Sequence, residues 1–421
     1  MYIELSEIAF YVNDKISSRN ITLDDYVTTD CILQNKRGRE LANNLPPVAC
    51  SLTRYCCGDI LVANIRPYLK KIWFADKEGG ASSDVLVFRA KEGYSSEYLF
   101  ALLMQDAFFD YVMQGAKGSK MPRGDKDQIM RYKTPKHSSN ENAIGGFVLN
   151  ITQKIRLNEQ INRNLEAMAK RLYDYWFVQF DFPDENGRPY KSSGGKMVWN
   201  ETLKRNVPEG WEVKKMRELL KSTENGEWGF DSLFNGSLIE IHCIRGADIV
   251  DLIGAPVRYI SEKKTSKLLK EDDIIIEISG GSPVQATGRS NYVNSQILEF
   301  YNNKMTCSNF CKSIALKDKL YSPYFFCTWN LFYDNGNMFN YEGKTNGIKN
   351  LQLDMLLEES WYFPPKELAE KFRNYYHAIL DKRGKTQKEN VFITLLRDRL
   401  LPLLMNGQVS IKRLNSDLSH G

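Results

Sequence analysis

The chain has 421 residues, more than one average domain holds, so we expect at least two domains. Apolar residues make up 42% of it and aromatic residues 12%, which is enough for packed cores and argues against a largely disordered chain. The net charge of +5 is compatible with an anionic partner but does not require one.

Membrane and metal sites are not expected. No apolar run approaches the ~20 residues that cross a bilayer, and the acidic start "MYIELSEIAF" lacks the layout of a signal peptide, so we expect a cytoplasmic protein. The eight cysteines form no Cys-x-x-Cys pair, and the four histidines sit near none of them with the spacing of metal ligands. We therefore expect reduced thiols rather than a structural zinc site.

Familiar catalytic motifs are missing. The triplet GKT (343–345) is not a phosphate-binding loop, because that pattern requires a glycine where Met338 stands. The patterns GxGxxG, HExxH and GxSxG are absent, as is the Pro-Pro-aromatic box of amino-methyltransferases. A nuclease-like pattern can be assembled only from Asp184 with Glu212 and Lys214, which is too short to be specific. The sequence predicts no catalytic residue and no metal ligand.

In chain order, the first half alternates strand and helix patterns. "DILVANI" (59–65) and "VLVF" (85–88) predict strands, and "SSEYLFALLMQDAFFDYVMQ" (95–114) predicts one helix with Ser96 as its N-cap. A helix is predicted over about 150–177. The exposed joint "PDENGRPYKSSGG" (183–195) follows it, and "VPEGW" (207–211) opens the second half. There "DIIIEI" (273–278) and "KSIAL" (312–316) predict strands, and a helix is predicted over about 366–401.

The chain also matches itself. "ELSEI" (4–8) matches "KMREL" (215–219), "GDILV" (58–62) matches "DDIII" (272–276), and "SSEYLF" (95–100) matches "YSPYFF" (321–326). The segment 118–135 matches 347–364, so the difference in residue number grows from 211 to 229 along the chain. The matches keep one order, which indicates that a domain and the helix after it are duplicated. The period is too long for a solenoid.

The two predicted helices carry the same apolar pattern. Its members recur at alternating steps of four and three, as in the a and d positions of a coiled coil, and equivalent members share one offset in residue number, 228. They are Ile161, Leu165, Met168, Leu172 and Tyr175, then Ile393, Leu396, Leu400 and Leu403. At an earlier a position both copies are polar, with Asn158 and Thr386. Glu389 departs from the pattern, and Pro402 should kink or end its helix. The alternative is two unrelated amphipathic helices, each packed on its own domain.

Together these segments resemble the specificity subunit of type I restriction–modification systems. The resemblance covers nearly the whole chain and rests on "QINRNLEAMAKRLYDYWFVQFDF" (160–182), "VPEGWEV" (207–213), "GDILVANIRPYLKKI" (58–72) and the order domain–helix–domain–helix. It implies an α/β (α+β) fold with duplicated target-recognition domains, joined by two long antiparallel coiled-coil helices with pseudo-twofold symmetry. The expected boundaries are 1–137 and 207–363 for the domains, 138–182 and 364–410 for the helices, 183–206 for a linker and 411–421 for a tail.

The resemblance also implies a function and partners. Such a subunit is non-catalytic and works in host defence, within an adenine-N6 methyltransferase and ATP-dependent endonuclease complex. Each repeat reads one half of a bipartite, asymmetric site in double-stranded DNA, and the helices set the gap. The expected partners are two methyltransferase subunits and two motor-nuclease subunits. S-adenosylmethionine, ATP and magnesium are expected on those partners, and no cofactor on this chain.

Basic and polar residues near Gly-rich turns are the candidates for DNA contacts, because glycine permits close approach to phosphate and arginine pairs with guanine. The alternative for each is a solvated turn. The first repeat offers Asn64, Arg66, Tyr68, Lys70, Lys71, Lys117, Ser119, Lys120 and Arg123. The second repeat offers Ser279, Ser282, Gln285, Arg289, Lys344, Asn346 and Lys349.

The aromatic run at the end of the first helix has two interpretations. Tyr173, Tyr175, Trp176 and Phe177 predict a surface that binds a methyltransferase subunit, or packing of the helix end onto the domains. For the whole chain, the rival to a DNA-reading subunit is a scaffold whose repeated domains bind proteins. A nuclease centred on Glu212 is the more distant alternative.

Overall fold

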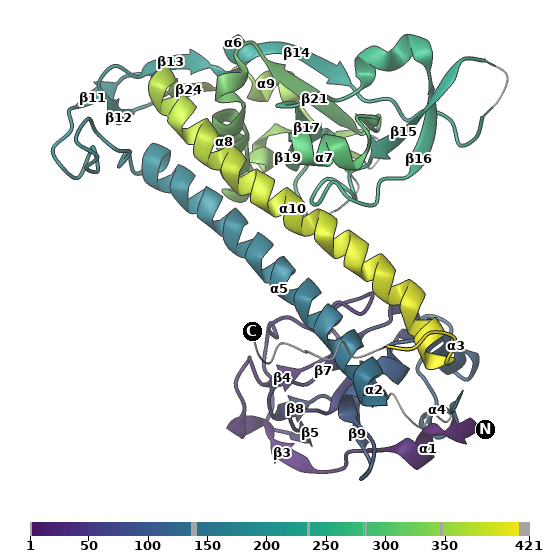
Figure 1. Ribbon diagram of the computed structural model, residues 1–421. Coiled ribbons are helices and arrows are strands. Elements are labelled where there is room, and N and C mark those ends of the chain that lie inside the picture. Colours follow the sequence, from purple (N-terminus) through teal and green to yellow (C-terminus); the bar gives the residue numbers. More distant parts are fainter. Residues whose placement is uncertain are drawn as a thin grey trace, which may run out of the picture. The chain divides into compact units, whose positions relative to one another are not determined.

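The computed structural model describes residues 2–135, 141–233, 236–280, 282, 284–345 and 348–411, without the side chains of Lys344 and Thr345. The chain forms two compact units, which we name unit 1 (1–160 with 389–421) and unit 2 (161–388). Each unit contains one repeat, the start of the long helix that follows it and the end of the other long helix (Figure 1). The boundaries between the compact units therefore fall within the long helices and not at the ends of those helices.

In unit 1 the first repeat has two four-stranded sheets, in the orders β2-β9-β6-β7 and β3-β5-β8-β4, and the pair β1-β10. Only β4 and β8 are parallel among these described strands. The strands are β1 (Tyr2–Glu4), β2 (Ala9–Tyr11), β3 (Lys15–Ser17), β4 (Tyr26–Val27), β5 (Ser51–Tyr55), β6 (Ile60–Ala63), β7 (Ile72–Phe74), β8 (Gly79–Ala81), β9 (Val85–Ala90) and β10 (Lys133–Pro135). The helices are α1 (Leu5–Ile8), α2 (Ser96–Leu103), α3 (Asp106–Gln114) and α4 (Lys126–Met130).

In unit 2 the second repeat has the sheets β14-β21-β17-β19, β16-β15-β20 and β18-β23-β22, the pair β13-β24, and the hairpin β11-β12 before it. The strands are β11 (Met197–Asn200), β12 (Arg205–Pro208), β13 (Glu212–Lys215), β14 (Leu220–Asn225), β15 (Leu238–Ile244), β16 (Val257–Ser261), β17 (Ile274–Glu277), β18 (Ser279–Gly280), β19 (Ser290–Tyr292), β20 (Met305–Cys307), β21 (Cys311–Leu316), β22 (Glu342–Thr345), β23 (Ile348–Leu351) and β24 (Ser360–Phe363). The helices are α6 (Met216–Leu219), α7 (Ser295–Phe300), α8 (Ser322–Asp334) and α9 (Leu353–Leu356).

The sheet topology confirms the duplication. The order β2-β9-β6-β7 of unit 1 recurs as β14-β21-β17-β19 in unit 2, and the pair β1-β10 recurs as β13-β24. In these pairs Ile3 lies opposite Thr134, and Lys214 lies opposite Trp361. Because Thr134 and Trp361 differ by 227 in residue number, the match of 118–135 with 347–364 at an offset of 229 is out of register by two. That error shifts every equivalence drawn between the late loops of the two repeats.

The two long helices are α5 (Glu141–Tyr173), continued by a π-turn over Asp174–Val178, and α10 (Lys366–Met405). Within each unit they run side by side and antiparallel. In unit 2, Asn162 contacts Thr386 while Tyr173 packs on Phe372. The start of α5, Glu141, lies before the predicted residue 150; Gly145, unfavourable in an isolated helix, is accommodated there by close packing. Pro402 lies inside α10, which ends three residues later.

The predicted coiled-coil seam is only half right. Leu165 and Leu172 are partly buried, but Ile161, Met168 and Tyr175 are among the exposed large apolar side chains of α5. The buried positions of α5 are Ile144, Val148, Ile155, Asn158, Ala169, Tyr173, Trp176 and Phe177. Adding 228 to most of them gives buried positions of α10: Phe372, Tyr376, Thr386, Arg397, Leu401, Leu404 and Met405. The period and the predicted polar position at Asn158 and Thr386 are therefore correct, but the seam also includes Ala169 and Arg397, which an apolar pattern does not register.

One local prediction also changes. The segment 95–114 forms two helices, α2 and α3, and Ser95 rather than Ser96 caps the first by accepting a hydrogen bond from Tyr98 N. The joint predicted after α5 is exposed over 185–188 and 191–194, as expected, and hydrogen bonds hold it beside the end of the helix. The Asp181 carboxylate accepts hydrogen bonds from Ser192 N and Oγ, both at 2.7 Å, and the Arg205 guanidinium stacks over the Phe180 ring.

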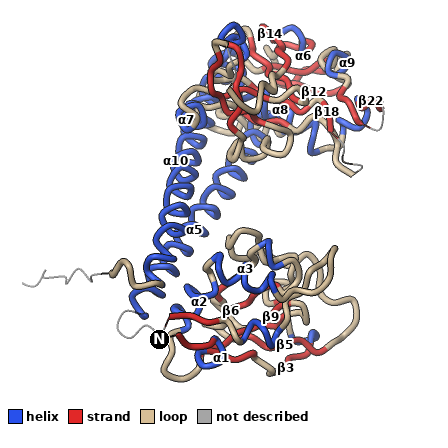
Figure 2. Tube along the Cα trace, turned by 90° about the vertical axis from the view of Figure 1, so that its right-hand side faces the viewer, coloured by secondary structure: helices blue, strands red, loops and turns tan. Residues whose placement is uncertain are grey.

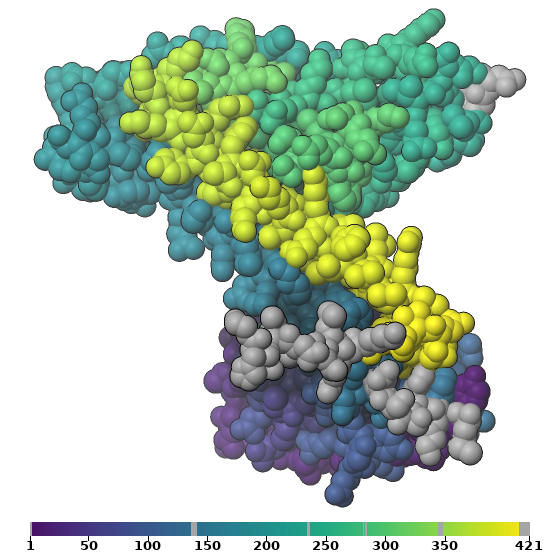
Figure 3. All heavy atoms as spheres, viewed as in Figure 1, coloured from purple at the N-terminus to yellow at the C-terminus, as the bar shows by residue number. Residues whose placement is uncertain are grey.

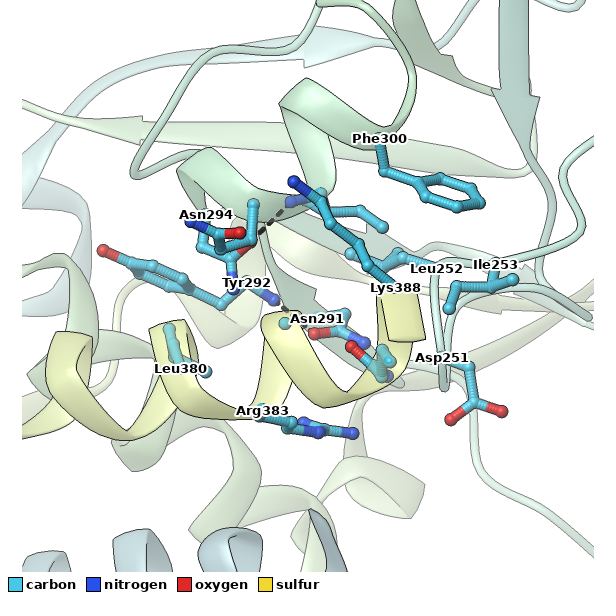
Figure 4. Close-up of a pocket in the computed structure, with 14 residues that line it drawn as sticks. Asp251, Leu252, Ile253, Asn291, Tyr292, Asn294, Phe300, Leu380, Arg383 and Lys388 are labelled. Carbon is cyan, nitrogen blue, oxygen red and sulfur yellow. Dashed lines mark hydrogen bonds between the residues drawn. The ribbon is translucent and has the colours of Figure 1, made fainter. Parts of the chain in front are cut away.

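Unit 2 also holds α10 against its sheet. Arg373 and His377 of α10 both contact the Asp272 carboxylate, at 2.9 Å and 3.4 Å. Further along α10, Leu380, Arg383 and Lys388 lie beside Asn291, Tyr292 and Asn294 (Figure 4). The groove between these elements has room for about 30 Å³, which suits a water molecule rather than a ligand.

Among the described residues, no helix combines the length and apolarity needed to cross a membrane. In the same part of the chain, no group of three or more His, Cys, Asp and Glu side chains is arranged to hold a metal ion.

Candidate nucleic-acid interface

In unit 1 the two segments predicted to contact DNA lie together. The turn after β6 pairs with the loop before α4 through isolated bridges from Ile65 to Arg123 and from Lys117 to Arg123. Arg66 N donates to Pro122 O at 2.7 Å, and the buried Asn64 side chain donates to Gly124 O at 3.2 Å. Asn64 therefore joins the two segments and does not point to solvent. We name this surface the first paired loop, formed by 64–71 and 117–124.

Four of the predicted cations in the first paired loop have internal partners. Lys70 pairs with Asp106 at 2.9 Å, Lys117 with Asp125 at 3.1 Å and Arg123 with Asp84 at 2.7 Å. Lys71 Nζ donates to the carbonyl of Thr29. Ion pairs at such exposed positions are weak, so binding DNA can replace them at small cost.

Four other predicted side chains are exposed at the first paired loop. Arg66, Tyr68, Ser119 and Lys120 make no side-chain hydrogen bond or ion pair with the residues that the structure describes. Arg66 has a left-handed backbone (φ 53°), and so has Lys70 (φ 51°), which makes the turn between them compact. The loop thus offers two unneutralised cations and a tyrosine ring, a combination suited to a nucleic-acid backbone.

Unit 2 builds an equivalent surface. Strand β23 pairs with β18 on one side and with β22 on the other, and Figure 2 shows β18 and β22 at the same end of the unit. Ser279 Oγ donates to Asn350 Oδ1 at 2.6 Å across this pairing, and Lys349 Nζ contacts Gln285 O at 3.4 Å. We name this surface the second paired loop, formed by the described residues 278–280, 282, 284–289, 342–345 and 348–350. Ser282 lies in it and accepts a hydrogen bond from Gln285 N.

Two predicted cations of the second paired loop, Arg289 and Lys349, are neutralised internally. Arg289 forms two hydrogen bonds with the buried Glu277 carboxylate, at 2.8 Å and 2.6 Å, and these raise the pKa of its guanidinium. Lys349 is buried, 3.1 Å from Glu342 and over the Phe339 ring. Burial alone would raise the pKa of the Glu342 carboxyl, but the hydrogen bond from Thr287 N and the ammonium of Lys349 lower it overall. Arg289 and Lys349 thus hold the loop together.

Two predicted residues cannot be placed in this way. Asn346 lies outside the described residues, and only the backbone of Lys344 is described, in β22.

Sequence reasoning missed a groove beside the second paired loop. It has a volume of about 370 Å³ and brings the side chains of Asn350 and Gln352 together with Lys312 and Asp354. Amides and a lysine are groups that hydrogen-bond to base edges and phosphates. The sequence could have identified Asn350 through the equivalence of the two repeats, if segments 118–135 and 347–364 had been matched in the correct register.

The aromatic residues at the end of α5 divide into two sets. Tyr173, Trp176 and Phe177 are buried in the core of unit 2, where the Phe177 ring lies 4.9 Å from both Tyr324 and Phe372. Packing of the helix end is therefore what these three do in the structure. Tyr175 is exposed, so the prediction of a partner-binding surface is left with this member of the run.

Exposed apolar side chains also recur on the helices. Besides Tyr375 of α10, they are Leu157, Ile161, Met168 and Tyr175 on α5 and its π-turn, and Phe392, Leu395, Leu396 and Leu403 on α10. Met168 with Leu396, and Tyr175 with Leu403, are related by the offset of 228 in residue number, so these two pairs occupy equivalent positions. The space-filling view shows α10 at the surface of each unit rather than covered by the domains (Figure 3). Each unit therefore carries an apolar strip on a helix, of the kind that binds another protein. We name these eight residues the helix strips.

The nuclease interpretation gains no support from the geometry. The Asp184 carboxylate accepts hydrogen bonds from Asn186 N and Arg188 N, both at 2.8 Å, and Glu212 pairs with Lys214 on β13. These groups have ordinary structural partners.

Known proteins resemble the chain in sequence and in fold. The chain is 25% identical over 337 residues to the type I restriction enzyme MjaIX specificity subunit of Methanocaldococcus jannaschii, covering 77% of this chain and 71% of that protein. It is 21% identical to the HindI specificity subunit of Haemophilus influenzae, covering 91% and 94%. No protein-family model matches it.

A solved structure extends the comparison to the fold. The crystal structure of the type I restriction–modification S subunit from M. genitalium matches with a TM-score of 0.58 at 12% identity, covering 95% of this chain and 94% of that one. The resemblance indicated by the sequence is thus confirmed: the chain is related to type I restriction enzyme specificity subunits in sequence, and has the fold of an S subunit along nearly its whole length.

Proposed function

We propose that this chain is the non-catalytic DNA-specificity subunit of a type I restriction–modification complex. The observation that carries the proposal is the recurrence of a paired loop in each repeat, built on the same strand pairing but bearing different side chains. Two similar surfaces with different chemistry suit a bipartite site whose halves differ in sequence. Each paired loop contacts one half-site, and the long helices set the gap between them.

The helix strips supply the second part of the proposal. An adenine-N6 methyltransferase subunit binds at each strip, one at Ile161, Met168 and Tyr175 and one at Phe392, Leu396 and Leu403. The pairs Met168 with Leu396 and Tyr175 with Leu403 stand at equivalent positions on the two helices, which suits two copies of one partner. S-adenosylmethionine belongs to these subunits, and ATP and magnesium to motor-nuclease subunits that join them.

The experiment for this function is co-expression of the chain with the methyltransferase subunit of the same system, followed by mapping of N6-methyladenine across the host genome. We expect one new asymmetric motif of two short specified blocks separated by a fixed gap. A soluble complex that adds no methylation would contradict the proposal.

A binding measurement separates DNA reading from the scaffold alternative. We expect the affinity of the complex for its cognate duplex to fall steeply as the salt concentration rises. The slope of log affinity against log salt concentration should steepen by about 0.9 for each neutralised phosphate. Replacing Arg66 and Lys120 by alanine lowers that slope by about 2. Replacing Lys221, an exposed lysine on β14, serves as the control and leaves the slope unchanged. Affinity that ignores salt would favour a scaffold that binds proteins.

A further inference from the structure

One backbone position carries different side chains in the two paired loops. In unit 1, Arg123 pairs with Ile65 on one side and with Lys117 on the other. In unit 2, Asn350 pairs with Ser279 on one side and with Gly343 on the other. Each is the middle residue of three adjacent backbone segments, so the two positions are candidates for equivalence.

The hydrogen bonds of the next residue establish the equivalence. Gly124 N donates to Asn64 O at 3.2 Å in unit 1, and Leu351 N donates to Ile278 O at 2.8 Å in unit 2. Asn64 and Ile278 differ by 214 in residue number, the same offset that relates the matched strands β6 and β17. Arg123 and Asn350 differ by 227, the offset of the strands β10 and β24 that follow them. Arg123 and Asn350 therefore stand at the same place in the duplicated fold.

Both side chains are held and yet retain free donors. Arg123 is 56% exposed and gives one terminal nitrogen to Asp84 at 2.7 Å, which leaves its other nitrogens free. Asn350 is partly buried beside the 370 Å³ groove, and its carbonyl oxygen accepts the Ser279 hydroxyl at 2.6 Å. Its amide nitrogen makes no hydrogen bond with any residue in the described part of the chain. A fixed side chain with unused donors suits recognition of a base edge.

The chemistry of the two side chains differs in a way that DNA distinguishes. In the major groove guanine presents two acceptors, O6 and N7, which match the two donors of an arginine. Adenine presents the N7 acceptor and the N6 donor, which match the amide of an asparagine.

From this, and resting on the proposed function, we infer that Arg123 and Asn350 are equivalent specificity-determining residues. Arg123 reads a guanine in the half-site of the first repeat, and Asn350 reads an adenine in the half-site of the second. The Asp84 carboxylate and the Ser279 hydroxyl are positioning groups that orient these two side chains.

The test uses the complex with its methyltransferase subunits and a panel of duplexes in which each specified base pair is changed in turn. For Asn350→Asp, which removes the amide donor, we expect discrimination at one A·T pair of one half-site to fall by about 5- to 150-fold. Arg123→Gln is expected to do the same at one G·C pair of the other half-site. The matched controls are Leu41→Ala in unit 1 and Val198→Ala on β11 of unit 2; both side chains are exposed and lie outside the paired loops.

The outcomes separate the inference from the proposed function. A loss of affinity spread evenly over all duplexes, or a change confined to the wrong half-site, would overturn the assignment while leaving the bipartite motif of the wild-type complex intact. A wild-type complex without a bipartite motif contradicts the proposed function itself. Ser279→Ala provides a second test that keeps the Asn350 amide: discrimination at the same A·T pair must weaken, and unchanged discrimination counts against the inference.

Discussion

The two repeats attach to their long helices by different means. In unit 1, Gly58 has a left-handed backbone (φ 89°), and Gly145 of α5 lies so close to α2 that a Cβ there would meet Tyr98 N at 2.4 Å. Adding the offsets 214 and 228 to these two residue numbers gives Asp272, also left-handed (φ 72°), and Arg373 of α10. In unit 2 an ion pair of 2.9 Å thus stands where unit 1 has two glycines. At equivalent positions, unit 1 thus packs two backbone segments closely, whereas unit 2 pairs two opposite charges.

The ion pair belongs to a larger cluster. The Asp272 carboxylate is only 4% exposed and also accepts the Tyr292 hydroxyl, while His377 Nε2 lies 3.4 Å away. A non-glycine residue with φ above zero costs about 1 kcal/mol, which these contacts must exceed. The comparison teaches that the duplicated architecture fixes the positions where helix and domain meet but leaves the chemistry free to diverge.

The largest expected effect breaks the ion pair. Asp272→Asn should lower the free energy of unfolding of unit 2 by about 3 kcal/mol, because it leaves Arg373 without its buried counter-charge. Urea unfolding followed by tryptophan fluorescence measures this, since six of the seven tryptophans (all but Trp73) lie in unit 2. The double variant Asp272→Gly with Arg373→Ala, which removes both charges and the strained φ, should cost less than the sum of its single variants. Additive costs would show that the two residues do not act as a pair.

The corresponding change in unit 1 fills the space between α5 and α2. Gly145→Ala should cost about 2 kcal/mol, because the new methyl group would meet the backbone of Glu97 and Tyr98, which cannot move aside cheaply. Hydrogen exchange of peptides from α2 and from the start of α5 reports this locally. The adjacent Gly146 is the control: a Cβ there meets nothing within 4 Å, so Gly146→Ala should stabilise the helix by about 0.5 kcal/mol. Equal effects at 145 and 146 would contradict the close-packing account.

The ion pair also predicts a pH dependence confined to unit 2. Burial alone would raise the pKa of Asp272, but hydrogen bonds from His377 and Tyr292 and the charge of Arg373 lower it from 3.8 to about 2. Because the folded-state pKa is depressed, the stabilisation is present above about pH 4 and is lost as the pH falls toward 2. After allowance for partial screening by solvent, the shift corresponds to about 2 kcal/mol. Comparing how the free energy of unfolding depends on pH in wild type and in Asp272→Gly isolates the contribution of Asp272. Parallel curves for the two proteins would exclude that contribution.

The sequence predicted the duplication, the period of the helices and the identity of the main strands. It could do so because burial imposes an apolar pattern that one sequence displays. It also predicted the polar seam position at Asn158, but Ala169 and Arg397 escaped it, since they occupy buried positions without being large apolar residues. The helix predicted from about residue 150 in fact begins at Glu141, and the close contact between Gly145 and α2 is tertiary, so no local pattern displays it.

The candidate interface was predicted as segments rather than as residues. In each repeat the two predicted segments lie together, because backbone pairing joins the segment after a sheet strand to the later loop. Which side chains stay available depends on ion pairs that form only in the folded chain: Glu342 pairs with Lys349 between β22 and β23, and Asp84 pairs with Arg123. Asn350 was overlooked because the repeats were matched out of register in this region, where strand pairing rather than residue similarity identifies equivalent positions.

The smallest expected effect concerns the polar positions of the helix pair. Asn158 and Thr386 occupy equivalent positions of the two helices, and both are buried. Each reaches across to the other helix: Asn158 Nδ2 donates to Glu389 at 2.8 Å, and Thr386 Oγ1 to Asn162. Thr386→Val removes this hydroxyl at constant shape and leaves the Asn162 oxygen without its donor, which should cost about 1 kcal/mol. Thr152→Val is the matched control, because the Thr152 hydroxyl bonds only to Val148 O of its own helix, and its removal should change little. Urea unfolding of both variants decides the point: equal losses would mean that Thr386 contributes within its helix rather than between the helices, and that the repeated polar position does not fix their register.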